Sequence, residues 1–209
     1  MIRQFNPSFL KQPIEPKYHQ AFDLVNKYKI LHLEIGAGVG MHPIQYCQHH
    51  PEIGLIAIER TREKFESFMQ RFNSNQKKYP NSFLNLVPVH ADVIPWLWFF
   101  DQQILFDKIW LLYPNPEPSN KNQRWIHAPF FSHLIERLKP EGEIELATNI
   151  STYADEVVEF AYKNWKFQAE KNIYIGQPRT HFEKKYLERG EICYQLLLRH
   201  SSKSLGISE

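Results

Sequence analysis

The strongest constraint on the fold is an apolar run at residues 30–35, ILHLEI, followed directly by a glycine-rich turn with Gly36, Gly38 and Gly40. A short apolar run bounded by glycines is typical of a buried strand. Glycines let the backbone turn sharply and let a ligand approach closely, and amides at the start of a helix favour anions. The segment predicts a buried strand, a ligand-binding turn and a helix over 41–50. A plain tight turn remains the alternative interpretation.

Short apolar runs alternate with helical segments along the rest of the chain. Further strands are expected at residues 54–59, 83–89, 107–112, 143–148, 167–174 and 191–199. Further helices are expected at residues 61–79, 127–138 and 151–164. Buried strands that alternate with helices are typical of a largely parallel sheet covered on both faces, and the last two strands suit an antiparallel finish. The chain is therefore predicted to be an α/β protein with a Rossmann-like, mostly parallel seven-stranded sheet.

Composition excludes several classes of protein. The chain has 209 residues, 43% of them hydrophobic and 23% charged, which is close to the globular average and unlike a disordered chain. Its two cysteines match no disulfide framework and no zinc spacing, so a cytoplasmic location is expected. No apolar run reaches the roughly 18 residues that a membrane helix needs. We expect an arm and first helix at 1–29, one domain at 30–199 and a flexible tail at 200–209.

Three carboxylates lie at or just beyond the ends of predicted strands. Ligands of open α/β sheets bind outside the carboxyl ends of the strands. Glu34 precedes the glycine turn, Glu59 ends the second strand, and Asp92 follows the third. Glu59 could accept both hydroxyls of a ribose, and Asp92 could meet an adenine amino group. Each residue alone is equally well explained as a solvated or helix-capping acid, but the three together favour a nucleoside cofactor.

These residues resemble motifs I to III of the class I S-adenosylmethionine-dependent methyltransferases. Four later blocks narrow the resemblance: FDKIWLLYPNPEP at 106–118, Gln123-Arg124, FFSHLIERLKPEGEIELATNISTYADE at 130–156, and THFE at 180–183. In this order they are similar to the blocks of the tRNA (guanine-N7-)-methyltransferase family, over about residues 30–198. The resemblance implies a class I methyltransferase fold, S-adenosyl-L-methionine as cofactor and tRNA as partner.

The resemblance also implies roles for particular residues. The expected cofactor-binding residues are Glu34, Gly36, Gly38, Gly40, Glu59, Asp92 and Asn115, and Asn115 is also the expected catalytic residue. The expected substrate-binding residues are Tyr113, Ser119, Lys121, Asn149, Thr180, Phe182 and Glu183. No metal site is expected. The run at 179–189 mixes basic and aromatic residues, so it is read either as a grip on a phosphate backbone or as an ordinary charged helix face.

Departures from the family pattern fall on the substrate side. Asn115 and Asn149 stand where the family has aspartates, and Ser119 stands where a lysine is usual. A neutral amide can neither act as a base nor stabilise a cation as a carboxylate does. Methylation at guanine N7 places a positive charge on the ring, so the loss of two carboxylates removes favourable electrostatics.

Three hypotheses follow from this pattern. The first is tRNA guanine-N7 methylation. The second is a divergent, paralogous branch of the same fold that methylates another acceptor, either a nucleobase amine or a small molecule. The third is a non-catalytic descendant that binds RNA or a partner protein. A monomer or a homodimer is expected in each case, with no membrane partner.

Overall fold

The computed structural model describes residues 4–14, 18–115 and 120–200. The seven strands are β1 (Ile30–Ile35), β2 (Ile53–Glu59), β3 (Leu86–His90), β4 (Phe106–Leu112), β5 (Leu138–Thr148), β6 (Phe167–Ile173) and β7 (Tyr194–His200). The α-helices are α1 (Tyr18–Lys27), α2 (Met41–His49), α3 (Arg62–Lys78), α4 (Val93–Phe99), α5 (Phe131–Glu136), α6 (Ser151–Phe160) and α7 (His181–Glu188). Two 3-10 turns, Lys121–Gln123 and Trp125–His127, and a π-helical turn, Ala161–Trp165, complete the described elements.

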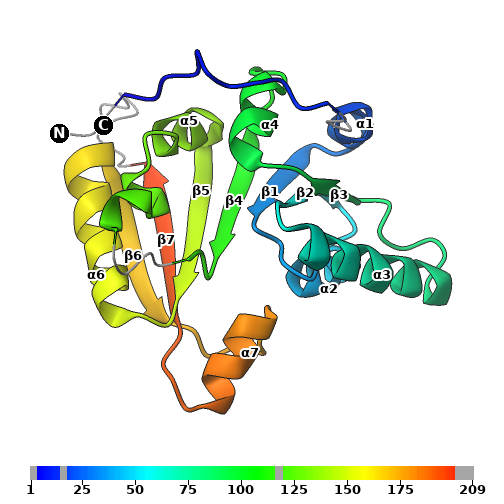
Figure 1. The fold of residues 1–209 in the computed structure, drawn as a ribbon. Helices are drawn as coiled ribbons and strands as arrows, with labels where there is room; N and C mark the ends of the chain where they lie inside the picture. Colours follow the sequence, from blue (N-terminus) through cyan, green and yellow to red (C-terminus); the bar gives the residue numbers. More distant parts are fainter. Residues whose placement is uncertain (1–3, 15–17, 116–119, 201–209) are drawn as a thin grey trace, which may run out of the picture. The chain divides into compact units, whose positions relative to one another are not determined.

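The strands follow the order β3-β2-β1-β4-β5-β7-β6 (Figure 1). The chain divides into two compact units. The N-terminal unit comprises Pro7–Phe106 and Arg179–His181, and the C-terminal unit comprises Asp107–Pro178 and the described residues from Phe182 onward, with residues 4–6. The prediction of a mostly parallel seven-stranded sheet is confirmed, while the predicted domain boundaries stay a prediction. The flexible tail was expected over 200–209, but His200 still belongs to β7, and residues 201–209 lie outside the described residues.

In the N-terminal unit, β1, β2 and β3 are parallel and almost wholly buried. Ile30 pairs with Ile53 at one end of the ladder, and Ile58 pairs with Val89 near the other. Full burial of both faces is what continuous apolar strands require. Helix α3 buries one face through side chains three and four residues apart, Phe65, Phe68 and Phe72. The helix predicted over 61–79 is therefore confirmed by its packing.

In the C-terminal unit, β7 runs antiparallel to both β5 and β6. The helix expected over 127–138 is shorter than predicted, because β5 already begins at Leu138, whose side chain is buried. Pro140 is tolerated there because the pairing of β5 with β7 starts only at Glu143. Helix α4 was missed, since its sequence VIPWLWF lacks a polar face that would mark a helix. Within the described residues, no helix combines the length and apolar character that crossing a membrane requires.

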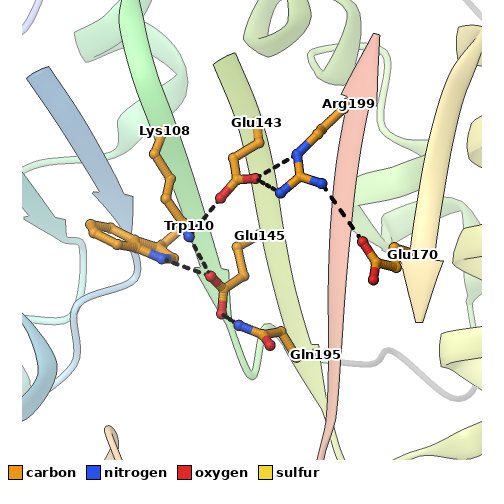
Figure 2. Close-up of polar contacts among 7 residues, drawn as sticks. All are labelled: Lys108, Trp110, Glu143, Glu145, Glu170, Gln195 and Arg199. Carbon is orange, nitrogen blue, oxygen red and sulfur yellow. Dashed lines mark hydrogen bonds and ion pairs between the residues drawn. The ribbon is translucent and has the colours of Figure 1, made fainter. Parts of the chain in front are cut away.

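A charged network ties β4, β5 and β7 together (Figure 2). The Nζ atom of Lys108 lies 2.8 Å from Glu143 Oε1 and 2.6 Å from Glu145 Oε2. Glu145 is only 2% exposed, and its carboxylate also accepts hydrogen bonds from Trp110 Nε1 at 3.3 Å and Gln195 Nε2 at 2.7 Å. A buried carboxylate is tolerated only when it is paired and hydrogen-bonded, and Lys108 supplies the positive charge.

The network continues to the edge strand β6. Arg199 donates to Glu143 Oε2 from Nε at 2.8 Å, and its Nη2 lies 2.6 Å from the same oxygen. Its Nη1 lies 3.6 Å from Glu170 Oε2 on β6. Burial alone would raise the pKa of Glu143, but the hydrogen bonds and charges of Lys108 and Arg199 outweigh it and hold that pKa below the ordinary value.

We expect Lys108→Met to lower the free energy of unfolding by about 3 kcal/mol, because it leaves the Glu145 carboxylate buried without its cation. The matched control is Lys163→Met, which removes an exposed partner of Glu159 and should cost under about 1 kcal/mol. Urea unfolding of both variants measures the difference. Equal losses would contradict the assigned role of Lys108.

The lowered pKa of Glu143 predicts a pH dependence of stability. Its contribution is fully present above the ordinary pKa of 4.5 and is lost as the pH falls through the lower pKa of the folded state. Glu143→Gln should therefore flatten the fall in unfolding free energy below about pH 4.5. Urea midpoints measured from pH 6 to pH 3 test this, and an unchanged slope in the variant would count against it.

Candidate functional site

The glycine turn after β1 has the backbone that its sequence predicts. Gly36, Gly38 and Gly40 have φ angles of +78°, +59° and +77°, in the left-handed region that other residues rarely adopt. A Cβ atom added at Gly36 or Gly38 would meet no described heavy atom within 4 Å, so the space beside these two residues is open. A Cβ atom at Gly40 would lie 2.0 Å from Cδ2 of Phe68 on α3. Only the first two glycines therefore leave room for a ligand.

Glu59 at the end of β2 holds this turn. Its Oε2 atom accepts a hydrogen bond from the amide of Gly38 at 2.8 Å, and its Oε1 atom accepts one from the amide of Thr61 at 2.7 Å. The side chain is nearly buried, with 5% exposed. Each carboxylate oxygen has a second lone pair, so Glu59 can still accept from a ligand hydroxyl. The predicted cofactor residue is thus also the residue that shapes the turn.

Glu34 is enclosed within the N-terminal unit. It is 1% exposed, and its Oε2 atom lies 2.9 Å from Nδ1 of His42, which is also buried. Glu34 precedes the glycine turn and His42 follows it in the first turn of α2, so the pair closes the loop at its base. Glu34 therefore stabilises the turn through a buried contact with His42. No local pattern in the sequence marks His42 as the partner of Glu34, because the contact forms only when the turn brings the start of α2 beside β1.

Asp92 lies beyond β3 and caps α4. Its Oδ1 atom accepts a hydrogen bond from the amide of Ile94 at 3.0 Å, which is the usual bond of an N-cap residue. Asp92 is exposed, so its second oxygen is accessible to a ligand. On the preceding strand end, the ring of His90 stacks on Phe65 with centroids 5.1 Å apart. Asp92 can therefore cap α4 through Oδ1 and still contact a ligand through its other carboxylate oxygen, so the two interpretations of this residue are compatible.

Tyr113 and Glu183, two residues predicted to bind substrate, contact each other in the C-terminal unit. Tyr113 follows β4 with a φ angle of +53°, and its hydroxyl donates to Glu183 Oε1 at 2.8 Å. Glu183 is fully buried at 0% exposure, which was not foreseen for a residue expected to bind substrate. Burial, a hydrogen bond with Cys193 and the charge of Glu183 all raise the pKa of Tyr113, so its hydroxyl stays protonated. This pair anchors α7 to the end of β4.

Asn149 lies directly after β5 and meets a carboxylate that the motifs did not identify. Its Nδ2 atom donates to Glu191 Oε2 at 2.6 Å. Sequence reasoning missed Glu191, because it lies 42 residues from Asn149 and outside the THFE block. Asn115 is exposed at the end of the described part of this loop, and Ser119 lies outside the described residues.

Lys121 and two neighbouring basic residues face Glu156 on α6. Lys121 Nζ lies 3.6 Å from Glu156 Oε2, and Arg124 and His127 are hydrogen-bonded to the same carboxylate. Burial favours a raised pKa of Glu156, but the hydrogen bond from His127 and the charge of Arg124 lower it. Lys121 is 68% exposed, so it is the residue of this group that faces solvent.

The THFE block is divided between the units. Thr180 belongs to the N-terminal unit, and Phe182 and Glu183 belong to the C-terminal unit. On α7 the rings of Phe182 and Tyr186 stack with centroids 6.4 Å apart, as expected for a helix face. The charged-helix interpretation of residues 179–189 is supported, while phosphate binding by this segment stays a prediction.

Comparison with known proteins identifies relatives over most of the chain. A family model described as "Putative methyltransferase" matches residues 28–196. A tRNA (guanine-N(7)-)-methyltransferase of Nitrosomonas europaea is 28% identical over 176 residues, covering 81% of this chain and 76% of that protein. A protein of the same name from Granulibacter bethesdensis is 28% identical over 167 residues, covering 77% and 73%.

Solved structures share the fold at low identity. The 16S rRNA methyltransferase KamB is 13% identical with a TM-score of 0.62, covering 96% of this chain and all of that chain. Human methyltransferase-like protein 13, solved in complex with SAH, is 17% identical with a TM-score of 0.60, covering 90% and 77%. These likenesses confirm the Rossmann-like class I fold. Because the family model covers most of the sequence, the chain belongs to this methyltransferase family.

Proposed function

We propose that the protein is an S-adenosylmethionine-dependent methyltransferase that methylates N7 of a guanosine in tRNA. The observation that carries the cofactor assignment is the open glycine turn held by Glu59. The open positions at Gly36 and Gly38 suit close approach of a ligand to the backbone. The near-buried carboxylate of Glu59 suits two ribose hydroxyls, and the exposed Asp92 suits an adenine amino group.

The acceptor assignment rests on the relatives of the chain. The proteins from Nitrosomonas europaea and Granulibacter bethesdensis that match this chain over most of their length are both named tRNA (guanine-N(7)-)-methyltransferases. The exposed Lys121 supports a polyanionic substrate, since lysine is a point charge that pairs readily with phosphate.

The residues of this chain would contribute positioning more than proton transfer. When bound, S-adenosylmethionine supplies an electrophilic methyl group on sulfur. Guanine N7 carries a lone pair and no proton, so the attack needs no general base, and an amide at Asn115 or Asn149 does not prevent it. Rate enhancement would come from holding N7 in line with the methyl group. Asn115 and Asn149 would then orient the base through hydrogen bonds of their amides.

We expect Glu59→Gln to raise the dissociation constant for S-adenosylmethionine at least tenfold. The substitution removes the negative charge and one hydrogen-bond acceptor of the proposed ribose site, and charge-assisted hydrogen bonds of this kind contribute about 1.5–3 kcal/mol. The control is Glu63→Gln, an exposed residue in the first turn of α3 with the same change of charge. Calorimetric titration measures both constants. A wild-type constant in the Glu59 variant would overturn its cofactor role.

Incubation of the protein with labelled S-adenosylmethionine and tRNA transcripts should produce 7-methylguanosine, detected by mass spectrometry of the digested nucleosides. Transcripts made with 7-deazaguanosine should accept no methyl group, because the nucleophilic nitrogen is replaced by carbon. Cofactor binding without methylation of tRNA would favour another acceptor, such as a nucleobase amine or a small molecule. Absence of cofactor binding would favour a non-catalytic descendant.

A further inference from the structure

Glu191 lies in a turn whose backbone is tightly held. Helix α7 ends with hydrogen bonds to the carbonyl of Tyr186 from the amide of Arg189 at 3.1 Å and from the amide of Glu191 at 3.0 Å. Gly190 has a φ angle of +71°, which is typical of the glycine that ends a helix. Because these bonds fix the backbone on both sides of the glycine, the position at which the Glu191 side chain leaves the chain is well defined.

The partner of Glu191 determines where the negative charge lies. The 2.6 Å bond from Asn149 Nδ2 to Glu191 Oε2 needs a donor at residue 149, and a neutral amide provides it. A carboxylate at 149 would face a second carboxylate at this distance, which strongly disfavours having both ionised. The pair of residues 149 and 191 therefore suits a single negative charge, and that charge is on Glu191.

Glu191 is more accessible than Glu183, the carboxylate of the THFE block. Glu183 is completely buried and accepts from the hydroxyl of Tyr113. The side chain of Glu191 is 35% exposed. The guanidinium of Arg189 lies 3.8 Å away but is itself more than half exposed, so solvent screens this ion pair. Glu191 is thus the carboxylate that a ligand near Asn149 can reach.

We propose that Glu191 supplies the negative charge that stabilises the methylated acceptor base, with Asn149 as the residue that positions it. This inference rests on the proposed function. In the transfer, the N7 lone pair forms a bond to the methyl carbon while the carbon–sulfur bond breaks and its electrons pass to sulfur. The positive charge of the sulfonium therefore moves onto the guanine ring. A fixed, partly desolvated carboxylate stabilises such a developing charge better than water does.

Three variants test the proposal. Glu191→Gln keeps the side-chain size and removes the charge. Asn149→Asp combined with Glu191→Gln moves the carboxylate to the other side of the same hydrogen bond. Glu188→Gln is the matched control, since Glu188 is an exposed residue of α7 that lies 3.8 Å from Lys184. Thermal unfolding of each variant verifies that the fold is retained.

Two measurements are made on each variant. The first is kcat for methyl transfer to tRNA, with the dissociation constant for S-adenosylmethionine determined in parallel. The second is the ratio of affinities for a short oligonucleotide containing 7-methylguanosine and for its unmethylated form, measured by fluorescence anisotropy. The second readout reports the preference for a cationic base and does not depend on turnover.

Glu191→Gln should lower kcat by roughly tenfold or more and reduce the preference for the methylated oligonucleotide, with the cofactor constant unchanged. The double variant should recover both quantities in part, and Glu188→Gln should match the wild type. A folded Glu191→Gln protein with wild-type kcat and preference would overturn the inference, as would equal effects in Glu188→Gln. If the wild type does not methylate tRNA, the proposed function fails, and the oligonucleotide preference still tests Glu191 separately.

Discussion

The strand ends of the N-terminal unit depend on two hydrogen bonds that the Glu59 carboxylate accepts from backbone amides. One bond reaches the glycine turn after β1, and the other reaches the start of α3. Because both amides point at one nearly buried carboxylate, the conformation of the turn and the direction of α3 depend on the same charge. A residue expected to contact a cofactor is therefore also a residue on which the local backbone depends. Loss of its charge would affect binding twice, through the contact and through the turn.

In the C-terminal unit, two carboxylates accept hydrogen bonds from neutral donors. Glu183 accepts from a tyrosine hydroxyl and Glu191 accepts from an asparagine amide, whereas the buried Glu145 is paired with Lys108. A neutral donor satisfies a carboxylate's oxygens without cancelling its negative charge. The carboxylate of Glu191 therefore lies directly beside the amide at position 149, and the guanidinium of Arg189 is 3.8 Å from Glu191. The loss of favourable electrostatics inferred from Asn115 and Asn149 took only the motif positions into account, and Glu191 lies outside them.

The sequence was informative where one local pattern determined the outcome. The buried strand at 30–35, the left-handed turn after it and the aromatic face of α3 each follow from apolar runs, glycines and helical spacing. Helix α4 was missed because its sequence is apolar on every side. His42 and Glu191 were missed as partners for a different reason: their roles are set by contacts with Glu34 and Asn149, and no local pattern encodes such pairs. Glu183 matched a motif, but only the tertiary structure shows that it is buried.

The close approach of Phe68 to Gly40 separates two reasons for keeping a glycine. Gly36 and Gly38 face open space, so the residues tolerated at these two positions would depend on the ligand that the protein binds. Gly40 is required because the ring of Phe68 fills the space that a Cβ atom would occupy. Whether position 40 tolerates a larger residue therefore depends on the size of the side chain at position 68. A smaller side chain on α3 would relieve the steric clash at position 40, leaving only the cost of a left-handed backbone. Variation at positions 40 and 68 should therefore be coupled among relatives, independently of any change in cofactor.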